Sequence, residues 1–126
     1  MTQIPTQISF RNMDKPMGIE EWVQESVVAL ERLHSRITGC RIMIERRHHS
    51  HRKGDHFQVR IDLTLPGAEL VVNHESVQGH GREALNSTVR GAFKDIHDQL
   101  DDHVRRLRQQ TQSADPAVAG LDSSYL

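Results

Sequence analysis

The chain has 126 residues, a formal net charge of −1 with neutral histidines, and 36% hydrophobic against 26% charged residues. This length supports one domain with one hydrophobic core, and the balanced charge excludes a globally basic nucleic-acid-binding protein, so any contact with nucleic acid must come from local patches. The composition is unusual in its nine histidines. Because free imidazole titrates near pH ~6.5, these side chains would make the surface more positive at lower pH.

The single cysteine, Cys40, excludes an intrachain disulfide and suits a reducing compartment. The first residues lack the basic segment and the long apolar run of a signal peptide. No apolar run approaches the ~18 residues that a membrane span requires. We therefore expect a cytoplasmic protein without a membrane partner.

The first half of the chain predicts two strands around one helix. Residues 4–10 alternate apolar Ile8 and Phe10 with polar neighbours, which indicates a short strand. From Ile19 the apolar residues, Trp22 among them, recur at spacings of three and four, which predicts an amphipathic helix that ends between residues 34 and 39. Alternation resumes over 40–45 and predicts a second strand.

The second half predicts a hairpin and a long helix. Alternate side chains over 57–65 are apolar, Pro66-Gly67 is a turn signal, and 69–73 returns as a fourth strand. The helix is expected over 82–108, on an apolar stripe that runs from Leu85 through Phe93 to Leu107. Gly91 inside this helix costs roughly 1 kcal/mol of helix propensity relative to alanine.

The order β-α-β-β-β-α predicts an α+β fold, in which both helices cover one face of a four-stranded mixed sheet and leave the other face exposed. The first helix is a crossover between two strands, so those strands should be parallel and the later ones antiparallel. We expect a domain over residues 1–108 and a flexible tail over 109–126, which lacks periodicity and large apolar side chains.

Three stretches resemble one known family: HFQVRIDLTLPGAELVVNHE (56–75), ALERLHSRITGCRIMIE (29–45) and ISFRNMD (8–14). The chain is similar over about residues 4–108 to the bacterial ribosome hibernation-promoting factors, also called ribosome-associated translation inhibitors or sigma-54 modulation proteins. The resemblance implies a topology like that of double-stranded RNA-binding domains. It also implies that the small ribosomal subunit and its rRNA are the partners, and that the decoding channel is blocked in idle ribosomes.

The chain departs from the short members of this family at several helix positions that are basic there. These positions hold Ser26, Ala29, Asp95, Asp98 and Asp102, and Asn86 replaces an aromatic residue early in the last helix. The replacements motivate an alternative, a protein-interaction or regulatory module of the same fold that has lost ribosome affinity. Self-association is left open by the sequence.

The polar loop expected from residue 46 to 55 is the first candidate site. Its basic and titratable residues are Arg46, Arg47, His48, His49, His51, Arg52 and Lys53. They can bind RNA phosphates by charge, or they form a solvated loop that keeps the sheet soluble. A metal site from these histidines and His56 lacks a nearby cysteine and a helical i,i+4 spacing, so we expect no metal ion and no cofactor.

The exposed side of the last helix is the second candidate, with Arg90, Lys94, Arg105, Arg106 and Arg108. Opposite charges at i,i+4 join residues 94 and 98, 101 and 105, and 102 and 106, which favours a structural role for the middle of the helix. The cluster at 105–108 is the better RNA candidate, and a helix C-terminus expected there would favour its positive charge.

The open sheet face is the third candidate, through Arg11, Arg41 and Arg60. These side chains either line an RNA surface or pair across strands with Glu45, Asp62 and Glu69. The sequence carries no phosphate-binding glycine loop, no HExxH and no cysteine–histidine constellation, so we expect neither catalysis nor a small-molecule substrate.

Overall fold

The computed structural model describes residues 4–47, 56–76 and 81–114, and the structural statements below concern this part of the chain. Its elements are β1 (Thr6–Arg11), α1 (Ile19–Leu33), β2 (Gly39–Arg47), β3 (His56–Leu65), β4 (Ala68–Glu75) and α2 (Gly81–Ala114). The predicted order and the α+β class are confirmed.

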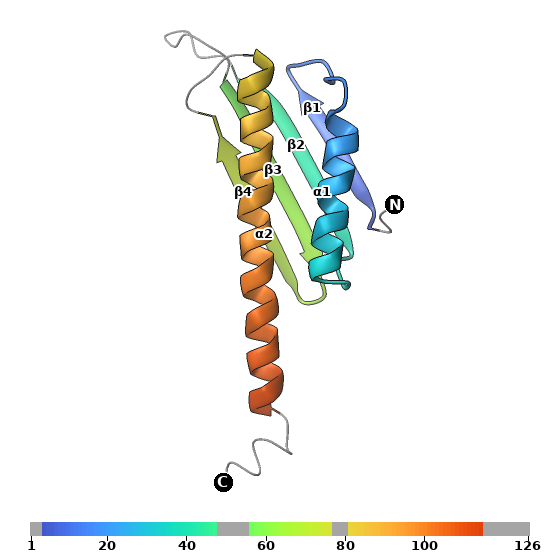
Figure 1. Cartoon of the computed structure of the whole chain (residues 1–126), viewed down its shortest axis with the longest axis vertical. Helices are drawn as coiled ribbons and strands as arrows, with labels where there is room; N and C mark the ends of the chain where they lie inside the picture. The colour runs from blue at the N-terminus through green and yellow to red at the C-terminus, as the bar shows by residue number, and fades with distance from the viewer. Residues whose placement is uncertain (1–3, 48–55, 77–80, 115–126) are drawn as a thin grey trace.

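The sheet has four strands in the order β1-β2-β3-β4. β1 and β2 are parallel, and the β2–β3 and β3–β4 pairs are antiparallel, as the crossover and the hairpin predict. The hairpin turns at Gly67, whose φ of 74° suits glycine. Both helices lie on one face of the sheet and both begin at the same end of it (Figure 1).

The core lies between that face and the two helices. Val59, Ile61 and Leu63 of β3 have 0% exposure, because strand alternation aims them at the helices. From the helix side, Val23 and Val27 of α1 and Val89, Ile96 and Leu100 of α2 close the same core. Burial of such side chains stabilises the fold by about 1.5–3 kcal/mol each.

Two aromatic side chains join the helices. The rings of Trp22 on α1 and Phe93 on α2 meet edge to face, with 5.4 Å between centroids and 79° between planes. Phe93 is buried, whereas Trp22 is only partly buried at the margin of the core. The expectation that both pack on apolar stripes is therefore confirmed, with Trp22 at the edge.

The strands extend further than the sequence indicated at the end where β2 and β4 finish. Arg46 and Arg47 were expected in a loop, but they belong to β2 and pair with Phe57 and His56 of β3. β4 likewise continues to Glu75. Backbone pairing between the strands continues here although the side chains are polar. The pattern of apolar and polar side chains therefore does not indicate where these strands end.

α2 is longer than predicted. It runs past Arg108 to Ala114 and has 34 residues, which corresponds to about 51 Å. Its last part projects beyond the sheet (Figure 1), and Leu107, expected in the apolar stripe, is 39% exposed there. No glycine or proline interrupts residues 92–114, so nothing in the sequence stops the helix at 108. The rest of the predicted tail, 115–126, lies outside the described residues.

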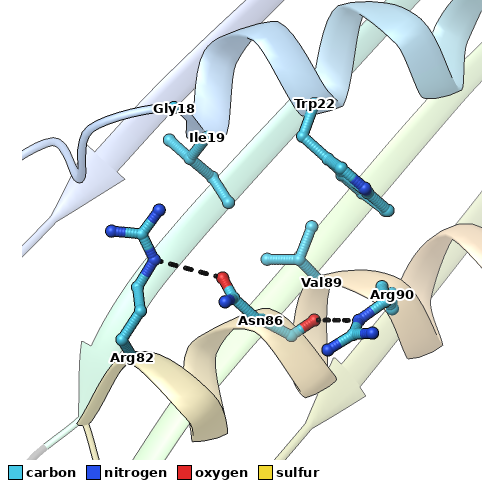
Figure 2. A pocket seen from close by; sticks show the side chains of 7 residues that line it. All are labelled: Gly18, Ile19, Trp22, Arg82, Asn86, Val89 and Arg90. Carbon is cyan, nitrogen blue, oxygen red and sulfur yellow. Dashed lines mark hydrogen bonds between the residues drawn. The ribbon is translucent and has the colours of Figure 1, made fainter.

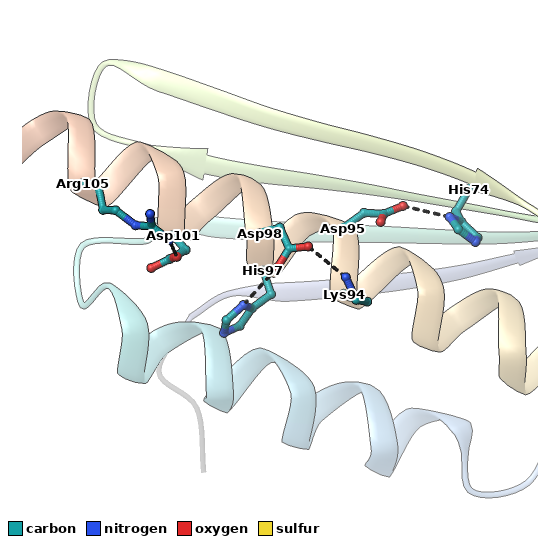
Figure 3. Close-up of polar contacts among 7 residues, drawn as sticks. All are labelled: His74, Lys94, Asp95, His97, Asp98, Asp101 and Arg105. Carbon is teal, nitrogen blue, oxygen red and sulfur yellow. Dashed lines mark hydrogen bonds and ion pairs between the residues drawn. The ribbon is translucent and has the colours of Figure 1, made fainter.

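Gly91 lets α2 pack closely on β4. A Cβ at this position would fall inside van der Waals contact with the imidazole ring of His74, which points from β4 toward α2. His74 Nδ1 lies 2.8 Å from Asp95 Oδ2, one helical turn further along α2 (Figure 3). The glycine that reduces helix propensity therefore makes room for a strand-to-helix hydrogen bond.

A double-mutant cycle tests this packing. Gly91→Ala should gain little or no stability in the native background, because the displaced His74 ring can no longer bond Asp95. In a His74→Ala background the same change should stabilise the protein by up to about 1 kcal/mol, the propensity difference between alanine and glycine. Urea unfolding of the four proteins measures both values. Equal effects of Gly91→Ala in both backgrounds would contradict the proposed clash.

The thiol of Cys40 should be unreactive in the native protein. The side chain is 2% exposed, and burial, with a smaller contribution from the charge of Asp62, raises its thiol pKa to about 12. A chromogenic disulfide reagent at pH 8 should therefore react only after unfolding. The matched control is Cys40→Ala with Ser9→Cys, which places a thiol at an exposed position of β1. Equally fast reaction of both native proteins would contradict the burial.

Candidate nucleic-acid interface

The structure distributes the sequence-predicted basic residues over separate surfaces. Arg11, Arg41 and Arg60 lie on the open sheet, Arg46 and Arg47 at the end of β2, and Arg90, Lys94, Arg105, Arg106 and Arg108 along α2. The loop residues His48, His49, His51, Arg52 and Lys53 lie outside the described residues. Whether the described residues face free solvent or a carboxylate decides how readily each can bind a phosphate.

The open sheet face holds one shared ion-pair cluster. Arg41 Nη2 lies 3.6 Å from Asp62 Oδ2, and Arg60 Nε donates to Asp62 Oδ1 at 2.9 Å. The side chain of Asp62 is only 13% exposed, so its charge is held between the two guanidinium groups. The expected cross-strand pairing therefore occurs between Arg41 and Asp62, whereas Arg60 and Asp62 lie on the same strand, β3. These three side chains, with Arg11, line a hollow of about 410 Å³ on the exposed face.

Arg47 and Arg46 point to opposite faces at the end of β2. Arg47 lies between two carboxylates, at 3.6 Å from Glu45 Oε1 and 3.5 Å from Glu75 Oε1. His56 Nε2 lies 3.7 Å from the other oxygen of Glu75. Arg46 instead lines a hollow of about 620 Å³ beside the start of α2, together with Arg82. Within the described ranges, no group of three metal-ligating side chains is present.

Acidic residues of α2 pair with three of its five predicted basic residues. Lys94 Nζ lies 3.1 Å from Asp98, and Arg105 pairs with Asp101 (Figure 3). Arg106 lies 2.6 Å from Asp102. The three i,i+4 pairs expected from the sequence are thus confirmed. The hydrogen bond from Arg105 holds the pKa of the Asp101 carboxyl below its ordinary value.

The cluster at 105–108 does not stand at a helix C-terminus. Because α2 continues to Ala114, its last turn contains no basic residue, and the expected interaction of this cluster with the helix dipole was wrong. Arg105 and Arg106 are held by their aspartates, whereas Arg108 is exposed and forms no ion pair with any described residue.

Arg82 was expected only as the first residue of the long helix, but its contacts make it a functional candidate. Its Nη2 donates to the carbonyl oxygen of Met17 at 2.5 Å, and its Nε donates to Asn86 Oδ1 at 3.2 Å (Figure 2). These bonds connect the first turn of α2 to the chain just before α1. The spacing of four that joins positions 82, 86 and 90 on one side of a helix could have indicated the group.

Arg82, Asn86 and Arg90 form one wall of a hollow between the helices. The space measures about 320 Å³, and its other lining residues are Gly18, Ile19, Trp22 and Val89. We call it the inter-helix hollow. Arg90 Nε donates to the backbone oxygen of Asn86 at 3.4 Å, and neither arginine forms an ion pair with a described residue.

Solved structures share this fold. The Thermus thermophilus Protein Y N-terminal domain matches with a TM-score of 0.58 and 15% identity, over 79% of this chain and 98% of that one. A ribosomal subunit interface protein from Coxiella burnetii matches with a TM-score of 0.61 and 16% identity, over 81% of this chain and 99% of that one. A comparison with curated protein sequences finds no match.

The family resemblance seen in the sequence is confirmed by a match to a family model. The model is described as sigma 54 modulation protein / S30EA ribosomal protein, and it matches residues 6–111, from β1 nearly to the end of α2. The description of this family makes its members ribosome-associated proteins. The chain therefore belongs to the sigma 54 modulation protein / S30EA ribosomal protein family.

Proposed function

We propose that this protein binds the small ribosomal subunit at the decoding channel, contacts its rRNA, and keeps idle ribosomes from translating by occupying tRNA and mRNA sites. Family membership over residues 6–111 is the observation that carries the proposal. Binding of this kind needs no catalysis, because the protein acts by competing for space. A ribosomal partner also implies the cytoplasmic location expected from the sequence.

The charge arrangement supports an interface at one end of the molecule. Both helices begin there (Figure 1), so the partial positive charges of their N-termini lie at the same end, where Glu20, Glu21 and Glu83 of the first turns offset part of this charge. Arg46 and Arg82 line a common hollow at this end, together with Asp14. The end of β2 pairs with the start of β3 there, and the basic stretch 48–55, which joins them in the sequence, lies outside the described residues. Phosphates are attracted to such a local patch although the net charge of the chain is −1.

The ion pairs indicate which arginines are available to phosphates. Arg41, Arg47, Arg60, Lys94, Arg105 and Arg106 each face an aspartate or glutamate. A phosphate must compete with those carboxylates. Arg11, Arg82 and Arg90 form no ion pair with a described residue, and Arg108 interacts only with the more distant charge of Asp101. We therefore propose that the second group contributes more to RNA binding.

The second candidate function is a protein-interaction module that has lost ribosome affinity. Three intrahelical ion pairs on α2 favour it, because they leave the outer side of this helix nearly neutral where phosphate contacts would need free positive charge. In the described part of the chain no helix could cross a membrane. Co-sedimentation with ribosomes separates the two functions, since only the first predicts salt-sensitive pelleting.

Occupancy of the decoding channel predicts competition with its normal ligands. The protein should bind purified small subunits that lack mRNA and tRNA, and it should bind much less to subunits loaded with mRNA and initiator tRNA. Filter binding of labelled protein measures both. An irrelevant duplex RNA added at the same phosphate concentration controls for general polyanion competition. Equal binding to empty and loaded subunits would contradict the proposed location.

Salt dependence tests the basic segment. Replacing Arg46, Arg47, Arg52 and Lys53 with alanine should weaken ribosome binding and reduce the slope of log affinity against log salt by roughly 0.7–0.9 for each phosphate that the variant no longer neutralises. Because Arg47 faces two glutamates, we expect this side chain to contribute least to the change in slope.

The matched control removes the same number of positive charges from paired sites. Alanine at Arg41, Lys94, Arg105 and Arg106 should change the slope much less, since these side chains contact carboxylates. If both quadruple variants reduce the slope equally, net charge rather than the basic segment accounts for binding.

A further inference from the structure

We propose that the inter-helix hollow binds one phosphorylated nucleoside, with its phosphate on Arg82 and Arg90 and its base or sugar against Trp22, Ile19 and Val89. The source is either an exposed nucleotide of rRNA or a free mononucleotide. The site goes beyond the proposed function, because it can bind its ligand without a ribosome. Every lining residue lies within the described part of the chain.

The arginines are the first argument. Figure 2 shows Arg82 and Arg90 on α2 on either side of Asn86, opposite Trp22 of α1 and Gly18, which precedes this helix. The hydrogen bonds of both arginines go to uncharged oxygens, namely Met17 O, Asn86 Oδ1 and Asn86 O. Neither forms an ion pair with a described residue, unlike Lys94, Arg105 and Arg106 further along α2. Their positive charge therefore remains available to an anion.

The preorganised position of Arg82 is the second argument. Two hydrogen bonds, to the Met17 carbonyl and to the Asn86 side chain, hold its guanidinium at the rim of the hollow. Arg82 then needs little ordering to bind a phosphate.

The apolar wall distinguishes a nucleotide from a simple anion. Trp22, Ile19 and Val89 also line the hollow, and the Trp22 indole is held by its edge-to-face contact with Phe93. An indole beside arginines matches a phosphate joined to a flat heterocycle, because aromatic rings bind bases and guanidinium groups bind phosphates. The amide of Asn86 lies between the arginines and can bond a base edge or a ribose hydroxyl.

The size of the hollow limits the ligand to one small molecule or one nucleotide. A volume of about 320 Å³ lies at the lower end of the ~300–1,000 Å³ typical of ligand pockets. A peptide helix would not fit, and an inorganic phosphate alone would leave the apolar wall unused. We therefore commit to a nucleoside phosphate as the occupant.

Trp22 is the only tryptophan of the chain, so its fluorescence reports directly on the hollow. Titration with AMP, GMP, CMP and UMP should change the emission saturably for at least one nucleotide. Inorganic phosphate should bind several-fold more weakly. Arg90→Gln should weaken nucleotide binding about tenfold or more, since a charged hydrogen-bond partner is removed. Arg90→Gln is preferred as the main variant because Arg82 also holds the chain before α1.

The matched control is Arg60→Gln, which removes one exposed, paired arginine from the opposite face and should leave nucleotide binding unchanged. Urea unfolding verifies that both variants are folded. Inorganic phosphate that binds as tightly as every mononucleotide would overturn the proposal, because the apolar wall would then contribute nothing.

Ribosome binding of the same variants distinguishes the two sources. If free mononucleotides do not bind but Arg90→Gln weakens ribosome pelleting more than Arg60→Gln does, the ligand is an rRNA nucleotide and the proposal holds. If mononucleotides bind while the native protein does not pellet with ribosomes, the proposed nucleotide site is supported and the proposed ribosomal function is contradicted. If mononucleotides do not bind and the two variants pellet equally, the proposal is overturned even where ribosome binding itself is intact.

Discussion

One-sided burial of the sheet is the constraint on which the rest of the structure depends. The apolar side chains of β3 all point to one face, and neither helix alone covers that face, so α1 and α2 must lie side by side on it. Each helix follows a strand that runs in the same direction, since β1 and β2 are parallel and β3 reverses the direction between β2 and β4. Both helices therefore begin at the same end, and Arg82 comes next to the chain that enters α1.

The fold could be predicted because it depends on patterns that the sequence shows locally. Alternation identified the strands, spacings of three and four identified the helices, and a crossover plus a hairpin determined the strand directions. The ion pairs of α2 were also predictable, because their partners are four residues apart on one helix. The end of α2 was missed, since propensity changes little between Arg108 and Ala114.

The candidate site was harder to predict because its geometry is tertiary. The partners of Arg47 include Glu75, which reaches it only through the registers of β2 with β3 and of β3 with β4. The inter-helix hollow combines residues 18–22 with residues 82–90, and nothing in either stretch alone indicates the other. The role of Gly91 could not be predicted for the same reason. The His74 ring occupies the space that a side chain at position 91 would need, and this contact is tertiary.

The projecting part of α2 has a consequence for how stability is distributed along the chain. Residues 105–110 are all exposed, so no side chain of this stretch anchors the helix in the core, and intrahelical hydrogen bonds and ion pairs hold it. An isolated helical segment of this length is marginal in water, so its backbone amides should open far more often than those of the core strands. The molecule thus combines a cooperatively folded core with a helical extension beyond Val104 that can unfold locally. This extension can adapt to a surface while the core stays folded.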